Sequence, residues 1–260
     1  MSDAAARSEA LRVEVSAGLA RITLDRPPVN VLTTAMMREL ATALRRVAAD
    51  PEVRVVRLDA AGKTFSAGVD VGEHLGDLLP SMMEALGDLF VAFESVPQPV
   101  VAVVQGAALG GGLEVVLGCD LVVASERATF GQPEIKLGVF APPATVLLPR
   151  RIGLGAATGL LLTGESVGAV EAKRLGLANE VFPIEGFDAS ASAWIEKLLS
   201  LSGAALRRAK RAIRESAGMP VGDAHELVHH IYMTDLMATE DAHEGLRSFV
   251  EKRPPAWKHR

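Results

Sequence analysis

Two glutamates stand where this sequence could place acid–base chemistry. Glu114 follows the run Gly110-Gly111-Gly112 and has apolar neighbours. If the chain buries this carboxyl group, its pKa rises toward neutrality, which suits proton transfer. If the segment exposes one edge, Glu114 faces water, and the pattern leaves both options open. Glu134 lies beyond a predicted strand, in a loop-like segment where an acid is more often exposed, but the two carboxyl groups could converge in space.

Two loops that contain glycine could supply hydrogen-bond donors near those acids. Residues 65–70 and residues 106–112 each follow a predicted strand, and the second loop also precedes a predicted helix. Glycine lets the backbone approach a ligand closely, and a helix start offers unpaired N–H groups. Two such groups could stabilise one developing oxyanion, each typically contributing about 10²–10³ in rate. Tight packing of strand on helix explains the same glycines, and spacing alone slightly favours that simpler interpretation.

A literal H-E-x-x-H motif occupies residues 225–229. On a helix it would place His225 and His229 on one face, with Glu226 as the base for a zinc-bound water. The apolar residues between and after them fit an ordinary packed helix. A zinc-dependent hydrolase is therefore the weaker hypothesis, and no metal site is predicted.

Residues 164–168 match the pattern G-x-S-x-G, with Ser166 at its centre. A nucleophile elbow requires a strand before the serine and a helix after it. Residues 160–163 instead read as the end of a helix that begins near Gly155. We therefore expect no nucleophile at Ser166.

Composition excludes several classes of protein. Of the 260 residues, 49% are hydrophobic and 23% charged, with a formal net charge of −5 and no long Lys/Arg block, so nucleic acid is not expected as a partner. The most apolar stretch, residues 99–124, contains Glu114, Asp120 and several glycines, which argues against a membrane span. The single cysteine, Cys119, allows no internal disulfide, and residues 1–11 contain no apolar run typical of a secretory signal. A cytoplasmic protein is expected.

Alternating strands and helices predict an α/β architecture. Strands are predicted at 11–15, 20–24, 53–58, 100–104 and 121–124, with helices at 33–49, 82–94 and 113–117. The first two strands should form a hairpin. Beyond about residue 190 only helical patterns remain, at 191–200, 204–217 and 223–237. We expect a core that contains the site at 1–195 and a helical region at 196–260.

Several segments taken together resemble the crotonase (enoyl-CoA hydratase/isomerase) family over nearly the whole chain. They are Arg26-Pro27 with Asn30-Val31-Leu32, Phe65 to Asp70, Ala108 to Glu114, Cys119-Asp120, Phe130 to Glu134, Leu162 to Gly164, and Phe249 to Arg253. The resemblance implies a spiral of ββα units with a C-terminal helical region. It also implies assembly into a homotrimer or a dimer of trimers.

The same resemblance implies the roles of four residues. The N–H groups of Val69 and Gly111 would form the oxyanion hole, and Glu114 and Glu134 would hold one water over the β-carbon of a conjugated acyl-CoA thioester. The presence of both acids favours a hydratase. An isomerase that shifts a double bond, and a CoA-binding protein without catalysis, are the alternatives. No metal or redox cofactor is implied, because coenzyme A is part of the substrate.

Residues that would contact the substrate and its CoA moiety follow from the same resemblance. They are Pro28, Val29, Val31, Ser66, Gly68, Asp70, Val71, Gly110 and Pro133, with Lys252 or Lys258 of the same or a neighbouring subunit at the phosphates. The chain departs from the usual glycine-rich stretch after the second acid, because residues 140–145 read Phe-Ala-Pro-Pro-Ala-Thr. Two prolines stiffen this segment and should reshape the acyl pocket. Residues 138–142, 70–74 and 240–253 resemble hydratases of cyclic dienoyl-CoA from aromatic degradation.

Overall fold

The computed structural model describes residues 6–7 and 10–260. Residues 1–11, on which the prediction of no secretory signal rests, lie mostly outside these described residues. The strands are β1 (Ala6–Arg7), β2 (Leu11–Ser16), β3 (Leu19–Leu24), β4 (Val55–Ala60), β5 (Val100–Val104), β6 (Ala107–Leu109), β7 (Leu121–Ser125), β8 (Thr129–Gly131), β9 (Ser166–Gly168) and β10 (Glu180–Phe182).

Helices account for most of the remaining chain. The α-helices are α1 (Thr34–Ala49), α2 (Leu79–Ser95), α3 (Gly111–Gly118), α4 (Pro142–Ile152), α5 (Leu154–Thr163), α6 (Ala169–Leu175), α7 (Phe187–Leu199), α8 (Gly203–Ser216), α9 (Val221–His230) and α10 (Glu240–Glu251). Four shorter helical segments are η1 (Val71–His74), η2 (Gly76–Leu78), η3 (Pro133–Leu137) and η4 (Ile231–Leu236). Of the helices described, none is both long and apolar enough to cross a membrane.

The strands form two sheets. The larger sheet has the order β1-β2-β3-β4-β5-β7-β10, and its strands are parallel from β3 onward. The predicted hairpin of β2 and β3 is confirmed. Its two turn residues, Ala17 and Gly18, both have positive φ, which matches the twist of the paired strands. The smaller sheet has the order β6-β8-β9.

The chain repeats one path through these sheets. After each of the parallel strands β3, β4, β5 and β7 it forms a second short extended segment, and helical segments then return it to the start. The short segments are Leu32, which bridges to Val69, Ser66, which bridges to Ala108, and strands β6 and β8. This path is the predicted spiral of ββα units. Its consequence is that the loops after β4 and β5 lie side by side at the carboxyl ends of the strands.

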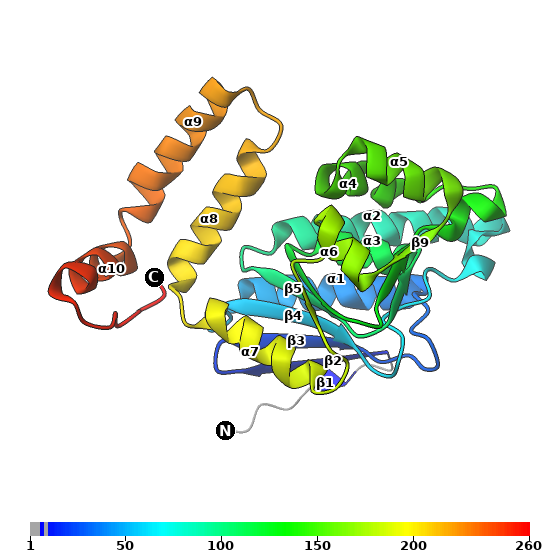
Figure 1. Cartoon of the computed structure of the whole chain (residues 1–260), viewed down its shortest axis with the longest axis horizontal. Coiled ribbons are helices and arrows are strands. Elements are labelled where there is room, and N and C mark those ends of the chain that lie inside the picture. Colours follow the sequence, from blue (N-terminus) through cyan, green and yellow to red (C-terminus); the bar gives the residue numbers. More distant parts are fainter. Residues whose placement is uncertain (1–5, 8–9) are drawn as a thin grey trace.

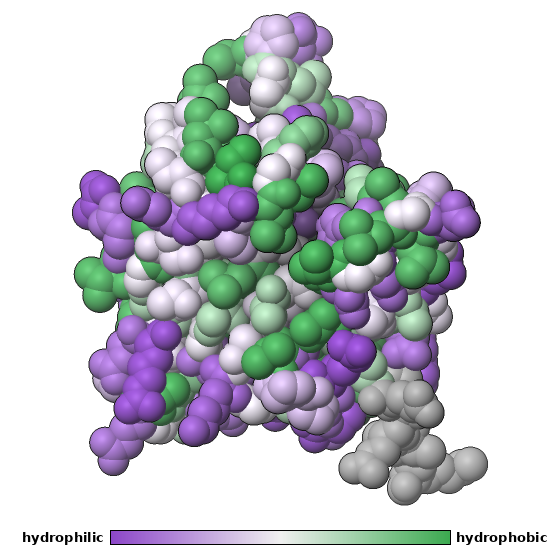
Figure 2. Space-filling view, turned by 90° about the vertical axis from the view of Figure 1, so that its right-hand side faces the viewer, coloured by the Kyte–Doolittle hydropathy of each residue, from purple (hydrophilic) through white to green (hydrophobic). Residues whose placement is uncertain are grey.

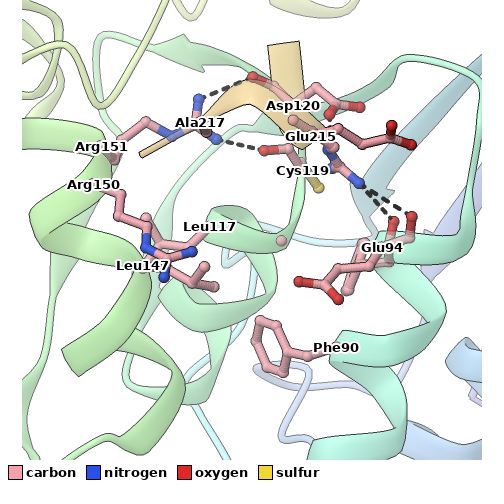
Figure 3. A pocket seen from close by; sticks show the side chains of 13 residues that line it. Phe90, Glu94, Leu117, Cys119, Asp120, Leu147, Arg150, Arg151, Glu215 and Ala217 are labelled. Atoms are coloured by element: carbon pink, nitrogen blue, oxygen red, sulfur yellow. Dashed lines mark hydrogen bonds and ion pairs between the residues drawn. The ribbon is translucent and has the colours of Figure 1, made fainter. Parts of the chain in front are cut away.

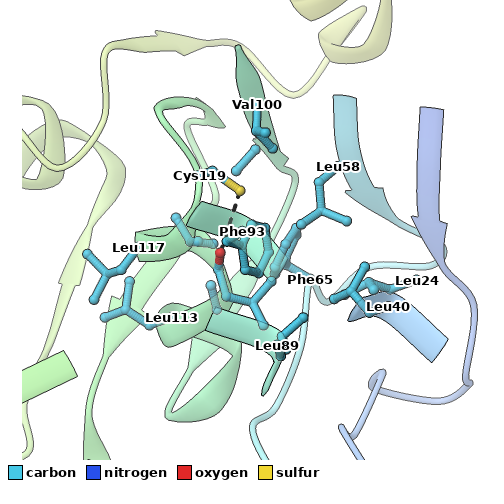
Figure 4. Packing of buried hydrophobic residues seen from close by; sticks show 14 of the residues in the cluster. Leu24, Leu40, Leu58, Phe65, Leu89, Phe93, Val100, Leu113, Leu117 and Cys119 are labelled. Atoms are coloured by element: carbon cyan, nitrogen blue, oxygen red, sulfur yellow. Dashed lines mark hydrogen bonds between the residues drawn. The ribbon is translucent and has the colours of Figure 1, made fainter. Parts of the chain in front are cut away.

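Alternation along the strands explains how the larger sheet is buried on both faces. In β5, Val100, Ala102 and Val104 join the main core, whereas Val101 and Val103 face the opposite side. Figure 4 shows the main core, where side chains from the sheet pack against α1, α2 and α3. The helices contribute residues such as Leu40, Phe93 and Leu113. Such two-sided burial is typical of parallel strands covered by helices.

Helix α7 covers the other face of the sheet. Its residues Phe187, Ala191 and Ile195 pack on that face, and the buried Arg57 of β4 pairs with Asp188. The predicted boundary at 195/196 therefore falls inside α7, and the following helix begins at Gly203. The division into two regions stays a prediction.

The chain after α7 leaves the body of the molecule. Figure 1 shows α8, α9 and α10 to one side of the two sheets, with the C-terminus beside α8 and α10. Helix α8 touches the body through the ion pairs of Lys210 and Arg214 with Asp120. We call residues 203–260 the C-terminal arm.

Several predicted elements differ from the structure in their bounds. Strand β4 begins and ends two residues later than the predicted 53–58, and its end extends to Ala60 because Asp59 and Ala60 pair with Thr23 and Leu24 of β3. Helix α2 begins at Leu79, with Pro80 in its first turn, where proline is tolerated. Strand β6 replaces part of the predicted glycine loop because it pairs with β8, a partner that local sequence does not reveal.

Candidate active site

Helix α3 places Glu114 in the interior. The glutamate stands in its first turn and is only 3% exposed, so the alternative in which it faces water is wrong. Its Oε1 accepts a hydrogen bond of 3.0 Å from the N–H of Ala144 on α4. Burial raises the pKa of Glu114 to about 8; the Ala144 N–H opposes this rise, and the charge of Glu134 adds to it.

The short helix η3 places Glu134 opposite α3. Its carboxyl group is partly buried, and this burial raises its pKa, while a backbone N–H and the nearby His74 act in the other direction. The amide of the buried Gln132, oriented with its nitrogen toward Glu134, donates to Oε2 at 2.9 Å and to Oε1 at 3.2 Å. Gln132 therefore fixes the orientation of the second acid.

The glycines of the second loop allow close approach of backbone to the site. Gly110 has φ +52° and ψ −128°, and a Cβ there would lie 2.4 Å from Glu134 Oε1. A Cβ on Gly111 would lie 3.2 Å from the backbone nitrogen of Val69. The glycines thus bring the loops after β4 and β5 together, as their sequence suggested.

Two backbone donors remain unpaired where these loops meet. In the described part of the chain, neither the N–H of Val69 nor that of Gly111 donates to an acceptor. Gly111 is the first residue of α3, so its N–H points out of the helix start. Buried backbone donors are rarely left without a partner, so a pair of them beside a cavity is suited to a ligand oxygen.

A cavity of about 360 Å³ joins these groups. Among the described residues that line it, only Glu114, Glu134 and His74 have ionisable side chains, and most of the others are apolar. Its apolar wall is formed by Leu75, Leu79, Met83, Leu86, Leu137, Val139, Phe140 and Pro142. Figure 2 faces the side of the molecule where η1 and η2 lie, and apolar groups gather there among polar ones. The cavity can therefore hold an apolar group with its reactive end at the acids.

Most of the predicted site residues border this cavity. Those that line it are Gly68, Val69, Val71, Gly110, Gly111, Glu114, Pro133 and Glu134. Ser66 is buried behind it, with its hydroxyl donating to Asn30 O at 2.8 Å, and Asp70 caps η1 through Gly72 N.

The predicted CoA-binding residues outside the cavity divide into two groups. Pro28, Val29 and Val31 lie on a turn held against the first loop, because Ala67 N–H donates to Val29 O at 2.9 Å. Neither Lys252 nor Lys258 lines the cavity. Lys258 lies beside Gly18 and Arg54, at the opposite end of the parallel strands. A single chain therefore does not bring either lysine to the acids.

Three groups at the site were not singled out for it in the sequence. Gln132 and the Ala144 N–H orient the two acids, and His74 joins them in the cavity. Gln132 lies only two residues before Glu134, a signal that was present in the sequence. Nothing local marks Ala144, because its contact with Glu114 exists only after α3 and α4 have packed.

Neither of the two short motifs lines this cavity. His225 and His229 stack on α9 with ring centroids 6.3 Å apart, in the C-terminal arm. Across the described residues, no group of three or more His, Cys, Asp or Glu could hold a metal ion. Ser166 follows the helix α5 and lies in β9, so the strand–serine–helix order of a nucleophile elbow is absent, as predicted.

A second cavity lies between α2, α3, α4 and the end of α8. Figure 3 shows its lining, with Arg151 donating to the backbone oxygens of Cys119 and Asp120. Burial raises the pKa of the Cys119 thiol to about 12, so this thiol is not a nucleophile at neutral pH. The polar groups here serve packing between α8 and the body.

Comparison with known proteins places this geometry in a family. The enoyl-CoA hydratase/isomerase family model matches residues 14–260. A cyclohexa-1,5-dienecarbonyl-CoA hydratase from Thauera aromatica is 39% identical, covering 95% of this chain and 96% of the relative. A 2,3-dehydroadipyl-CoA hydratase from Escherichia coli (strain K12) is 36% identical, covering 92% of this chain and 94% of the relative.

Solved structures agree with this result. An enoyl-CoA hydratase from Geobacillus kaustophilus HTA426 superimposes with a TM-score of 0.94 at 30% identity and covers 99% of both chains. One from Mycobacterium smegmatis gives a TM-score of 0.90 at 33% identity, covering 96% of this chain and 99% of that chain. The chain belongs to the enoyl-CoA hydratase/isomerase family. Its predicted fold and its predicted class, an enoyl-CoA hydratase, are confirmed.

Proposed function

We propose that this enoyl-CoA hydratase adds water to a cyclic dienoyl-CoA, a ring whose double bonds are conjugated with the thioester. The observation that carries the hydration chemistry is the convergence of Glu114 and Glu134 on one cavity with the unpaired N–H groups of Val69 and Gly111. The two carboxyl groups can hold a water molecule and transfer its proton. The two N–H donors can stabilise the thioester oxygen, which becomes negative during the addition.

The proposed reaction balances without any added reagent. The thioester oxygen lies at the N–H groups of Val69 and Gly111, and one water lies between the two acids. Its oxygen bonds to the β-carbon while Glu134 accepts a proton from it, and the π electrons move onto the thioester oxygen. Glu134 then gives the proton to the α-carbon. Because only carboxyl groups and N–H donors take part, no separate cofactor is needed.

The surroundings of the acids support different protonation states. With a pKa of about 8, Glu114 keeps its proton at neutral pH, and the Ala144 N–H holds one of its oxygens. Burial also raises the pKa of the less buried Glu134, but a backbone N–H and the nearby His74 act against this rise and favour the carboxylate. The two carboxyl groups then share one proton. The protonated Glu114 orients the water, and the ionised Glu134 acts as the base.

The shape of the acyl wall supports a cyclic substrate. Pro142 and Pro143 open α4, and Phe140 and Pro142 line the cavity beside Val139. Such stiff and bulky groups suit a flat ring better than a long flexible chain. The Thauera aromatica relative, by its name, hydrates a cyclic diene.

The C-terminal arm supports assembly with other copies. Val221, Tyr232, Phe249 and Val250 are exposed on it, and Tyr232 is the least so at 50%. We propose a homotrimer or a dimer of trimers, in the cytoplasm, in which Lys252 or Lys258 of one copy reaches the CoA phosphates bound to another. Light scattering after gel filtration tests the assembly, and a monomer at micromolar concentration would contradict it.

The test of function is a mass-spectrometric screen against crotonyl-CoA, longer enoyl-CoAs, and cyclic monoenoyl- and dienoyl-CoAs. We expect one water to be gained, fastest on a cyclic dienoyl-CoA. Glu114→Gln and Glu134→Gln should each lower kcat at least about 10²-fold, because each removes a group that touches the water.

The matched control is Glu185→Gln, at an exposed glutamate between β10 and α7, which should keep full activity. Faster reaction with crotonyl-CoA than with any ring would contradict the cyclic substrate. Exchange of the α-proton for deuterium without gain of water would favour an isomerase instead.

A further inference from the structure

Of the ionisable side chains that line the cavity in the described part of the chain, His74 is the one that the proposed reaction does not use directly. It ends the short helix η1 and is half-buried beside apolar residues of α2. A histidine in an otherwise apolar wall is costly unless it has a partner. The question is which partner it serves.

Hydrogen bonding fixes the ring and its tautomer. Nδ1 lies 3.0 Å from the backbone oxygen of Asp70. A carbonyl oxygen only accepts, so Nδ1 carries a hydrogen. In the part of the chain that the structure describes, the other nitrogen, Nε2, has no partner. Nε2 is therefore the atom available to the cavity.

The segment that carries His74 is held firmly. Asp70 Oδ1 accepts from Gly72 N at 2.8 Å, and Glu73 Oε2 accepts from both the N–H and the hydroxyl of Thr34 at 2.6 Å. Through these bonds, the nearby acids Asp70 and Glu73 already have partners. The His74 ring is therefore available to groups across the cavity.

The neighbouring elements offer few competing charges. The side of α2 at the cavity is apolar, and its acids Glu84 and Asp88 pair with Arg38 and Arg45 of α1. On η3, Lys136 lies against Gly164. Asp77 of η2 is exposed and does not line the cavity. The ionisable groups that share the cavity with His74 are Glu114 and Glu134.

We propose that His74 is a positioning residue, whose imidazole keeps Glu134 as the ionised member of the acid pair. This inference rests on the proposed hydration. When protonated, Nε2–H faces the cavity as a cationic donor and stabilises the Glu134 carboxylate. When neutral, Nε2 can accept a hydrogen bond from the water held there. The electrostatic effect of His74 on Glu134 has this direction.

The first experiment compares pH profiles of kcat/KM for the natural protein, His74→Gln and His74→Leu. Removing the cation should raise the pKa of Glu134, so the acid limb should move to higher pH by roughly 0.5–1 in both variants. The two replacements differ in packing but share the loss of charge. His243→Gln, at an exposed histidine on α10, is the control and should leave the profile unchanged. An unmoved acid limb in both variants would overturn the proposal.

The second experiment does not depend on turnover. An NMR titration of the Glu134 carboxyl group in the free protein should give a higher pKa in His74→Gln than in the natural protein, because loss of the imidazole removes an effect that favours the carboxylate. An unchanged titration would overturn the role of His74. If no acyl-CoA gains water but this coupling is found, the proposed hydration fails while the His74–Glu134 interaction stands.

Discussion

At the scale of single residues, Glu114 and Glu134 have the same type of side chain but lie in different surroundings. Glu114 is closed in by α3 and α4, whereas Glu134 is only partly buried and receives donors from Gln132. Burial disfavours the charged form, and donors favour it. The structure therefore separates the two acids by their surroundings, although their side chains are of the same type.

This separation predicts an alkaline limit to activity. With its pKa raised to about 8, Glu114 is protonated below that pH and ionised above it. Ionisation would place a second negative charge beside Glu134 and disturb the bound water. We expect kcat/KM to fall as pH rises through about 8. In Glu114→Gln, which cannot ionise, the residual activity should lack this limb; a limb that persists near pH 8 in that variant would assign it to another group.

At the scale of elements, the start of α3 determines where Glu134 can lie. Gly110 precedes α3 with a backbone conformation that only glycine adopts easily, and its Cα faces the Glu134 carboxyl group. Gly153 precedes α5 in a comparable way, with φ +79°, but a Cβ there would meet nothing within 4 Å. The two glycines therefore share a backbone conformation that would strain any residue with a Cβ, and they differ in what surrounds them.

Alanine at these two positions should separate strain from displacement of the acid. Gly110→Ala and Gly153→Ala should each lower the free energy of unfolding by about 1–3 kcal/mol. Only Gly110→Ala should push the Glu134 carboxyl group away, lowering kcat of the folded enzyme about 10²-fold. Thermal unfolding and steady-state kinetics on both variants check this. Equal kcat in the two variants would show that the position of Glu134 does not depend on Gly110.

At the scale of the whole molecule, a buried ion pair joins the C-terminal arm to the core. Lys210 Nζ lies 2.6 Å from Asp120 Oδ2 and donates to Gln98 O at 2.7 Å. Arg214 adds a contact of 2.7 Å with Asp120 Oδ1. Burial lowers the pKa of Lys210 to about 8, against the opposite effect of Asp120. The pair thus specifies where α8 docks more than it adds stability.

Breaking this pair should cost much more than breaking an exposed one on the same helix. Lys210→Met leaves Asp120 with Arg214 and the Val100 N–H as partners, and we expect a loss of about 3 kcal/mol in the free energy of unfolding. Arg211→Gln removes the exposed pairs of Arg211 with Glu215 and Asp235 and should cost less than about 1 kcal/mol. Urea unfolding measures both. Equal losses would mean that the arm is held by other contacts.

The sequence by itself determined many of the elements and the two acids of the site. The turn at Ala17 and Gly18 pairs β2 with β3, as the predicted hairpin required, and the predicted helix at 33–49 is α1, which Thr33 caps by accepting from Met36 N. Glycines beside an acid likewise indicated a close approach of backbone at Gly110. These features could be predicted because each depends on neighbours within a few residues.

Only the tertiary structure decided which groups act together. The sequence left Glu114 equally open to core and water, and its burial follows from α4, whose Ala144 is 30 residues away. It also left Glu134 more often exposed, and it did not show that Lys258 lies at the far end of the strands from the acids. The pKa of a carboxyl group depends on what covers it, and that cover comes from segments distant in sequence. The sequence therefore specifies which acids are present, whereas the fold decides which acids lie together and which of them keep a proton.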